Sequence, residues 1–344
     1  MAQIRRSSVP GILALFPLLL SACSDDPPPA RDPDAALLDL APDRSVDTSP
    51  DLAPDLAPPP PPVECKGFSK LAGDVTVKLK HGGKERVAYV HIPKGYDGTK
   101  KVGLVLNFHG YGSNAAQQAL YTGMNGAAYY MEMAAVHPQG LAGPLGTRGW
   151  NAGSCCGTNT LNKTDDVGYV AALIKELSTR LCVDPRRVYA TGMSNGAFFA
   201  YRLACQLSDR IAAVAPVAGV NTMSPCQTTR PVPVLHFHGT ADIYVAYKGN
   251  KLLDWPGAEK TTKDMAASNG CSSTVKEVFK KGSVTCEAYQ ACKGAAEVRL
   301  CTVDKGGHTW PGGLDIPIPW LGLKTKDINA TDAMLQFFKD HPMK

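Results

Sequence analysis

The segment Gly192-Met193-Ser194-Asn195-Gly196 constrains this chain more than any other stretch of its sequence. It follows a short run of β-branched and aromatic residues and precedes a run rich in Ala and Phe, so a strand, a sharp turn and a helix are expected in that order. Side chains at Gly192 and Gly196 would collide with the neighbouring strand and helix. Such a turn presents the Ser194 hydroxyl above the end of a sheet as a nucleophile. The alternative is a tight turn whose serine only caps the helix.

The chain from residue 63 onward alternates strand-like and helix-like segments. The run 102–109 is almost continuously apolar, as expected of a strand buried on both faces. Asp165 is a predicted N-cap for a helix over 167–181. The other expected strands are 86–92, 134–138, 188–191, 211–217, 232–238, 274–279, 284–289 and 297–303, and the other expected helices are 196–207, 257–268 and 331–339. This alternation predicts an α/β fold class, with a doubly wound, mostly parallel sheet and helices on both faces.

Asp242 and His308 complete a candidate catalytic triad with Ser194. Asp242 follows a late apolar strand, and His308 stands on a glycine-flanked loop after the last expected strand. The order serine, aspartate, histidine is that of the α/β-hydrolase fold. His308 would take the serine proton, and Asp242 would fix the tautomer of the imidazole. Asp254 and Asp264 are competing acids, but both lie farther beyond the end of the strand.

Two backbone amides are expected to bind the oxyanion of a tetrahedral intermediate. The Asn195 N–H lies at the start of a helix, directly after the serine. The Tyr111 N–H lies in the turn His109-Gly110-Tyr111-Gly112, which ends the strand 102–109. The alternative for this second turn is a plain glycine-rich connection.

The first 62 residues predict an export signal followed by a tether. Arg5 and Arg6 precede an apolar run that is too short to span a membrane, and Leu20-Ser21-Ala22-Cys23 then resembles the bacterial lipobox. We therefore expect a signal peptide over 1–22 and a lipid anchor on Cys23, with the protein exported and held at a membrane or cell surface. An ordinary signal peptide, with Cys23 there by chance, is the alternative. Residues 23–62 are rich in Pro, Asp and Ala, which predicts a disordered tether ahead of a catalytic domain over 63–344.

Charge and cysteine content limit the possible partners. The chain carries a formal net charge of +5 although its tether is acidic, so the domain is basic. It contains no nucleic-acid motif, and we expect no nucleic-acid partner. Ten cysteines remain besides Cys23, an even number that predicts disulfides in an exported chain. Zinc is the rival explanation, but no pair has Cys-x2-Cys spacing, so we expect no metal.

Six motifs occur in order along residues 65–340: His-Gly-Tyr-Gly-Ser-Asn, Trp-Asn-Ala-Gly-Ser-Cys-Cys-Gly, Asp-Asp-Val-Gly-Tyr, Arg-Val-Tyr-Ala-Thr-Gly-Met-Ser-Asn-Gly, His-Gly-Thr-Ala-Asp and Gly-Gly-His-Thr-Trp-Pro-Gly-Gly. Together they resemble the polyhydroxybutyrate depolymerase and feruloyl esterase-like family of secreted esterases. The resemblance implies a serine carboxylic ester hydrolase that uses no cofactor, with Ser194, Asp242 and His308 as its triad. It also implies a disulfide between Cys271 and Cys292; the other pairs stay open.

The resemblance leaves the substrate undecided. The depolymerase branch has a Trp-rich stretch where this chain has Trp150-Asn151-Ala152-Gly153, which favours feruloyl or acetyl esters of plant polysaccharide. The alternatives are a polyhydroxybutyrate depolymerase and a catalytically inactive polymer-binding module. Trp310 and Trp150 are the candidate substrate-binding residues, because each lies in a loop near the triad and could stack on an aromatic acyl group. Alternatively, such aromatic residues only pack their loops.

Overall fold

A computed structural model describes residues 64–68, 73–316 and 319–344. The predicted signal peptide over 1–22, Cys23 and the tether over 23–62 lie outside the described residues, and the domain boundary at residue 63 stays a prediction. Within the described part of the chain, no helix is both long enough and apolar enough to cross a membrane.

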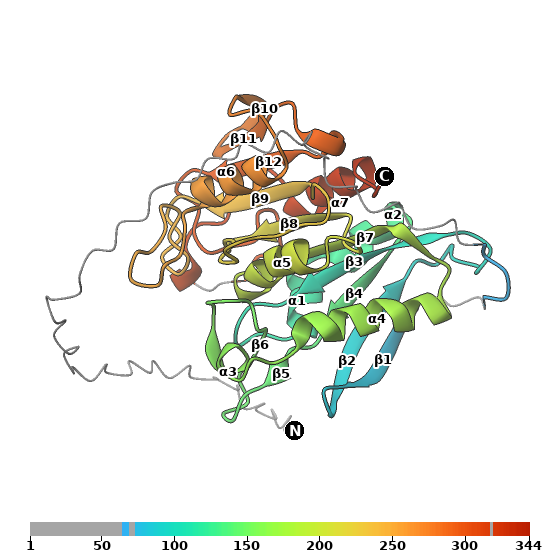
Figure 1. The fold of residues 1–344 in the computed structure, drawn as a ribbon. Coiled ribbons are helices and arrows are strands. Elements are labelled where there is room, and N and C mark those ends of the chain that lie inside the picture. Colours follow the sequence, from blue (N-terminus) through green and yellow to red (C-terminus); the bar gives the residue numbers. More distant parts are fainter. Residues whose placement is uncertain (1–63, 69–72, 317–318) are drawn as a thin grey trace, which may run out of the picture. The chain divides into compact units, whose positions relative to one another are not determined.

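A ten-stranded sheet organises the domain, in the order β1-β2-β4-β3-β7-β8-β9-β12-β11-β10 (Figure 1). The six strands from β4 to β12 in this order run parallel, and β1, β2, β11 and β10 add antiparallel pairs at the two edges. The strands are β1 Gly73–His81, β2 Lys84–Ile92, β3 Val102–Phe108, β4 Met133–Pro138, β7 Val183–Met193, β8 Ala213–Val217, β9 Val234–Gly239, β10 Val275–Lys281, β11 Val284–Tyr289 and β12 Val298–Val303. A separate small sheet pairs β5 (Leu141–Ala142) with β6 (Arg148–Gly149).

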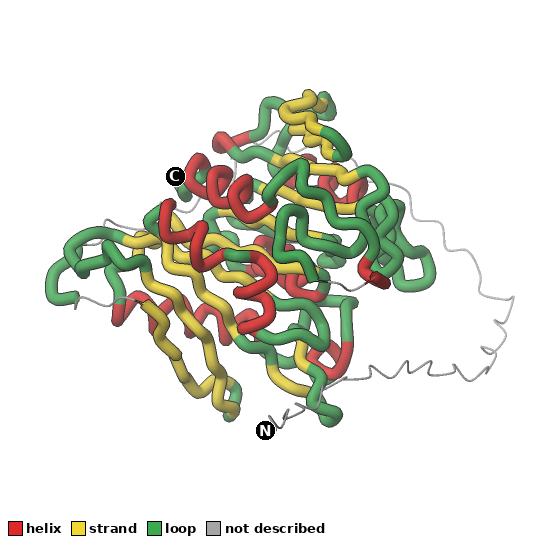
Figure 2. Tube along the Cα trace, turned by 180° about the vertical axis from the view of Figure 1, so that it is seen from behind, coloured by secondary structure: helices red, strands yellow, loops and turns green. Residues whose placement is uncertain are grey.

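Helices cover both faces of the large sheet. They are α1 Ala115–Thr122, α2 Met124–Tyr130, α3 Gly157–Leu161, α4 Asp166–Arg180, α5 Asn195–Gln206, α6 Ala258–Ser268 and α7 Ala330–Asp340, with 3₁₀ turns η1 Lys293–Ala295 and η2 Pro319–Leu321. Figure 1 shows α4, α5 and α6 in front of the sheet, and Figure 2 shows the opposite face covered by further helices. Because neighbouring residues of a strand point to opposite faces, Leu104 and Leu106 of β3 pack in the core with α4, α5 and α6, whereas Val105 packs in the core with α1, α2 and α7. The predicted α/β-hydrolase fold class is confirmed.

Five disulfides connect the ten domain cysteines. The expected Cys271–Cys292 bond is present. The pairs that the sequence left open are Cys65–Cys182, Cys155–Cys156, Cys205–Cys226 and Cys286–Cys301. Such a density of disulfides is typical of proteins that leave the reducing cytosol.

Candidate active site

The turn between β7 and α5 places Ser194 at the carboxyl end of the parallel strands. Its backbone has φ 55° and ψ −125°, a conformation that a non-glycine residue rarely adopts and that is found at functional turns. A Cβ atom on Gly192 would lie 2.6 Å from the carbonyl oxygen of Phe108, and one on Gly196 would collide with the same oxygen. The two glycines therefore allow β3 and α5 to approach closely and hold the turn in this strained form.

Asp242 and His308 come from the loops after β9 and β12, and their side chains meet. The Nδ1 atom of His308 lies 2.8 Å from Oδ2 of Asp242, and both side chains are buried. The other carboxylate oxygen, Oδ1, accepts the backbone N–H groups of Tyr244 and Val245 at 2.9 Å each. The carboxylate is thus fixed in orientation, and it selects the His308 tautomer that carries a proton on Nδ1 and leaves Nε2 free to accept one. Among the described residues, the Ser194 hydroxyl makes no hydrogen bond.

The turn after β3 lies directly beside Ser194. A Cβ atom on Gly110 would be 3.4 Å from the Cβ atom of Ser194. His109 holds this turn: its Nε2 accepts the Gly140 N–H at 3.0 Å, so its Nδ1 carries the proton and donates to the Gly110 carbonyl at 2.8 Å. Burial lowers the pKa of His109 to about 4, which keeps the ring neutral. The Tyr111 N–H therefore belongs to a turn of fixed shape next to the nucleophile.

Asn195 binds the loop 149–157 to the turn that carries Ser194. Its side-chain oxygen accepts the Trp150 N–H at 2.7 Å, and its Nδ2 donates to the carbonyls of Trp150 and Cys155 at 3.2 and 3.4 Å. The side chain is fully buried. The same residue whose backbone N–H was predicted to bind the oxyanion thus also fixes the loop that contains the Cys155–Cys156 disulfide.

Trp150 is buried, whereas the sequence analysis expected it to contact the substrate. The indole is 0% exposed, stacks on Phe199 with ring centroids 5.2 Å apart, and donates from Nε1 to the His109 carbonyl at 3.0 Å. A substrate has no access to a ring that is covered on all sides. Trp150 instead connects the turn after β3 to α5, and the expectation that it binds substrate is corrected.

Trp310 is buried in the same way, although it follows His308 by only two residues. Its ring is 0% exposed and its Nε1 donates to the Thr331 hydroxyl at 2.9 Å, while its backbone N–H donates to the Tyr121 hydroxyl at 3.0 Å. These bonds tie the loop that carries His308 to α1 and α7. Trp310 therefore supports the loop of His308, and its predicted role as a wall for the acyl group is also corrected.

Two tyrosine rings in the loops around the site are accessible. Tyr244 is 49% exposed and its ring centroid lies 5.2 Å from that of His308. Tyr111 is 44% exposed, and its ring covers Gly149 and Gly157, where any Cβ atom would collide with it. The sequence analysis did not consider Tyr244. The signal in the sequence that could have indicated Tyr244 is its position two residues after Asp242.

A buried chain of hydrogen bonds lies behind Asp242. The Nε2 atom of His238 lies 2.7 Å from the Val245 carbonyl, and because a carbonyl only accepts, this nitrogen must carry the proton. The other ring nitrogen, Nδ1, is then an acceptor. The donor to that Nδ1 is the Nε2 atom of His236 at 2.9 Å, and the Tyr201 hydroxyl donates to Nδ1 of His236 at 2.6 Å. His238 Nε2 also lies 3.6 Å from Oδ2 of Asp242. Burial lowers the pKa of both histidines, so the chain is neutral throughout.

Comparisons with known proteins find esterases. Residues 88–236 match the family model described as Esterase PHB depolymerase. This segment of the chain therefore carries a domain of that esterase family. It is 35% identical over 240 residues to feruloyl esterase B of Piromyces equi, an alignment that covers 65% of this chain and 42% of that relative. It is 29% identical over 256 residues to the putative esterase NocK of Nocardia uniformis, covering 68% and 73% of the two chains. Both relatives are named as esterases.

Solved structures show the same fold. The acetyl xylan esterase from Aspergillus awamori superposes with a TM-score of 0.54 at 14% identity, covering 77% of this chain and 98% of that one. The ferulic acid esterase of Anaeromyces mucronatus superposes with a TM-score of 0.50 at 15% identity, covering 80% and 92%. At such identities the likeness concerns the fold. No group of His, Cys, Asp or Glu side chains suited to a metal ion occurs in the part of the esterase that the structure describes.

Proposed function

We propose that this esterase hydrolyses carboxylic esters with Ser194 as nucleophile, His308 as general base and Asp242 as the residue that orients the imidazole. The observation that carries the proposal is the 2.8 Å contact between His308 Nδ1 and Asp242 Oδ2, at the same edge of the sheet as a serine in strained backbone. The fixed carboxylate leaves Nε2 of His308 as the atom that takes the Ser194 proton and returns it to the leaving alcohol.

The negative charge that develops on the carbonyl oxygen is stabilised by two backbone amides. The Asn195 N–H is the first of α5, where the helix dipole favours an anion. The Tyr111 N–H comes from the turn that His109 holds against Ser194. Neither donor has to move during the reaction, so their dipoles are already oriented when the charge forms.

The substrates are feruloyl or acetyl esters of plant polysaccharide. Relatives named feruloyl esterase support this assignment, as does the pair of half-exposed tyrosine rings at the triad. The Tyr244 ring next to His308 offers a flat apolar surface to an aromatic acyl group, the role that the sequence analysis had given to tryptophan.

Polyhydroxybutyrate depolymerase remains the second candidate function, because an apolar surface lies next to the His308 loop. Leu323 is 68% exposed and pairs with Gly306, which precedes His308 by two residues. Trp320 is 62% exposed in η2, and Ile243, directly after Asp242, is 76% exposed. Such a surface suits adsorption to an aliphatic polyester.

The esterase acts outside the cytosol. Five disulfides support export, and the lipobox-like Leu20-Ser21-Ala22-Cys23 supports a lipid anchor on Cys23 that holds the domain at a membrane through the tether.

The proposal is tested with the full chain and its Ser194→Ala variant on methyl ferulate, p-nitrophenyl acetate, acetylated xylan and polyhydroxybutyrate film. Ser194→Ala is expected to lose at least a thousandfold in kcat, because the nucleophile is removed, and to unfold at the same temperature as the parent. Ser178→Ala, on the exposed side of α4, is the matched control and retains full activity. A parent that hydrolyses no ester but binds polymer would make the domain a binding module, and a Ser194→Ala variant with a tenth of the parent activity would remove Ser194 from the mechanism.

A further inference from the structure

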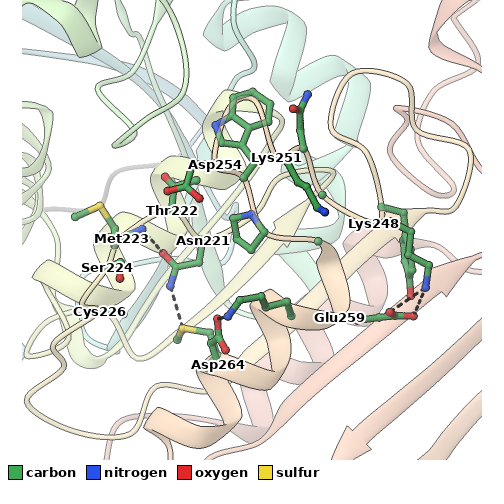
Figure 3. Close-up of a pocket in the computed structure, with 18 of the residues that line it drawn as sticks. Asn221, Thr222, Met223, Ser224, Cys226, Lys248, Lys251, Asp254, Glu259 and Asp264 are labelled. Carbon is green, nitrogen blue, oxygen red and sulfur yellow. Dashed lines mark hydrogen bonds and ion pairs between the residues drawn. The ribbon is translucent and has the colours of Figure 1, made fainter. Parts of the chain in front are cut away.

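A pocket of about 700 Å³ lies outside the triad, between the loop after β8, the loop after β9 and α6 (Figure 3). We call it the α6 pocket; its lining includes Asn221, Thr222, Lys251, Asp254, Trp255 and Asp264. Asp254 and Asp264, which the sequence analysis considered as rivals of Asp242, both line it. Nothing in the mechanism above uses this space.

The charges around the α6 pocket cancel. It is lined by three lysines and by three acidic residues, which are Lys248, Lys251, Lys260, Asp254, Glu259 and Asp264. Lys248 pairs with Glu259 at 3.0 Å and Lys260 with Asp264 at 2.7 Å. Lys251 and Asp254 make no ion pair with any described residue, and both are exposed. A pocket with no net charge does not select an ion, whereas a free ammonium and a free carboxylate are a strong donor and a strong acceptor for hydroxyl groups.

An aromatic ring completes this lining. Trp255 is partly exposed; its ring packs on Phe198 with centroids 4.9 Å apart, and its Nε1 donates to the Ser154 hydroxyl at 3.1 Å. The indole is therefore held in place before any ligand arrives, with its N–H already satisfied. A fixed apolar ring in the same pocket as hydroxyl-binding groups suits a sugar, which carries C–H groups on its faces and hydroxyls at its edge.

The α6 pocket lies close to the nucleophile. A Cβ atom on Gly219 would be 2.8 Å from the backbone oxygen of Ser194, and Asn221, which lines the pocket, follows Gly219 by only two residues. Two residues span at most about 7 Å, so this part of the lining lies on the order of 10 Å from the Ser194 backbone. The loop 149–157 connects the two regions, because the Ser154 N–H donates to the Thr222 hydroxyl at 3.4 Å and Asn195 holds the same loop. A short saccharide whose ester bond lies at Ser194 can span this distance.

We propose that the α6 pocket binds the carbohydrate part of the ester substrate, the uncharged polyhydroxylated leaving group, while the acyl group lies beside Tyr244. This inference rests on the proposed esterase function. It assigns Lys251 and Asp254 to hydroxyl groups of the saccharide and Trp255 to a sugar face. The repeat units of an aliphatic polyester carry no hydroxyl groups, so the α6 pocket favours the polysaccharide ester over the polyester.

The test compares two esters that share the feruloyl group and differ in the alcohol to which it is bound. The parent chain, Lys251→Ala, Asp254→Gly and the double variant are assayed on a feruloylated xylo-oligosaccharide and on methyl ferulate. Glycine is chosen because Asp254 has φ 51°, which glycine adopts without strain. Lys263→Ala is the matched control, an exposed lysine of α6 outside the pocket lining. The double variant is expected to lose about tenfold in kcat/KM on the oligosaccharide ester and less than twofold on methyl ferulate.

Equal losses on both substrates, or no loss on either, would overturn the inference while leaving the esterase assignment in place. If the parent chain hydrolyses neither ester, the proposed function fails, and the inference is then decided by titrating unesterified xylo-oligosaccharide into the parent and the double variant. Saccharide binding by the parent that is weakened tenfold in the double variant would still support the α6 pocket. Equal binding by the two proteins, or no binding by the parent, would reject it.

Discussion

His236 donates from Nε2 to Nδ1 of His238 at 2.9 Å, deep in the core and next to the acid of the candidate triad. The bond has only one direction, because the Val245 carbonyl fixes the proton of His238 on its far nitrogen. The same carbonyl belongs to the loop whose backbone amides hold Asp242. The chain that begins at Tyr201 therefore positions the carboxylate from behind, without touching the substrate.

The Tyr201→Phe variant tests this chain of hydrogen bonds, because it removes only the hydroxyl group at which the chain begins. The variant leaves Nδ1 of His236 buried without a donor, so the free energy of unfolding is expected to fall by about 1–3 kcal/mol. Urea unfolding at neutral pH measures the change. Tyr89→Phe, whose ring is 46% exposed, is the control and changes the stability little. Equal stability of the two variants would mean that the Tyr201 hydroxyl does not support the chain.

The sequence predicted the parts of the site that depend on local chemistry. The glycines around Ser194, the strand before it, and the strands whose following loops carry Asp242 and His308 all belong to short segments with clear patterns. The burial of Trp150 could not be predicted from a local pattern, because it depends on Phe199 and on the His109 carbonyl, which are distant in sequence. The bounds of the edge strand β1 could not be predicted for a related reason: most of its residues are at least partly exposed, so the apolar signal is weak.

Trp150→Phe distinguishes a supporting role from a substrate-binding role. Phenylalanine keeps part of the packing on Phe199 but removes the donor to the His109 carbonyl, which loosens the turn that carries the Tyr111 amide. We expect kcat to fall about tenfold on methyl ferulate and on p-nitrophenyl acetate alike, with KM little changed. A loss of activity on methyl ferulate alone would mean that Trp150 does contact the substrate.

Stability is expected to fall on mild acidification. Burial lowers the pKa of both His109 and His137 to about 4, against an ordinary value of about 6.5 in the unfolded chain. Above pH 6.5 the rings are neutral in the folded and the unfolded chain, so their contribution to the free energy of unfolding is complete. As the pH falls toward 4, only the unfolded chain takes up the protons, and this contribution is lost. Each histidine accounts for about 2 kcal/mol between pH 7 and pH 5.

His137→Gln isolates one of these two histidines. Glutamine keeps a donor for the Asn125 side-chain oxygen, which His137 binds at 2.7 Å, but it does not titrate. The difference in unfolding free energy between pH 7 and pH 5 should therefore be smaller by about 2 kcal/mol than in the parent. Parallel pH profiles of the two proteins would contradict the assignment of the acid sensitivity to His137.

Cys23→Ser tests the lipid anchor. The substitution removes the only residue that the lipobox-like motif can acylate, so the esterase should move from the membrane fraction to the soluble fraction of the host cells. Immunoblotting after a salt wash measures the distribution. Ser24→Ala, at the next position, is the control and stays with the membranes. A Cys23→Ser protein that still sediments with the membranes would reject acylation as the anchor.

Tyr244→Ala tests which ring contacts the acyl group. The Tyr244 ring is 49% exposed beside His308, and the backbone N–H that holds Asp242 is retained in the variant. An aromatic contact contributes about 0.5–1.5 kcal/mol, so kcat/KM for methyl ferulate should fall two- to tenfold. The value for p-nitrophenyl acetate should change less than twofold, because an acetyl group is too small to cover the ring. Tyr89→Ala, a tyrosine of similar exposure on β2, serves as the control and should affect neither substrate. If Tyr244→Ala reduces both activities equally, the ring supports His308 and does not select the acyl group.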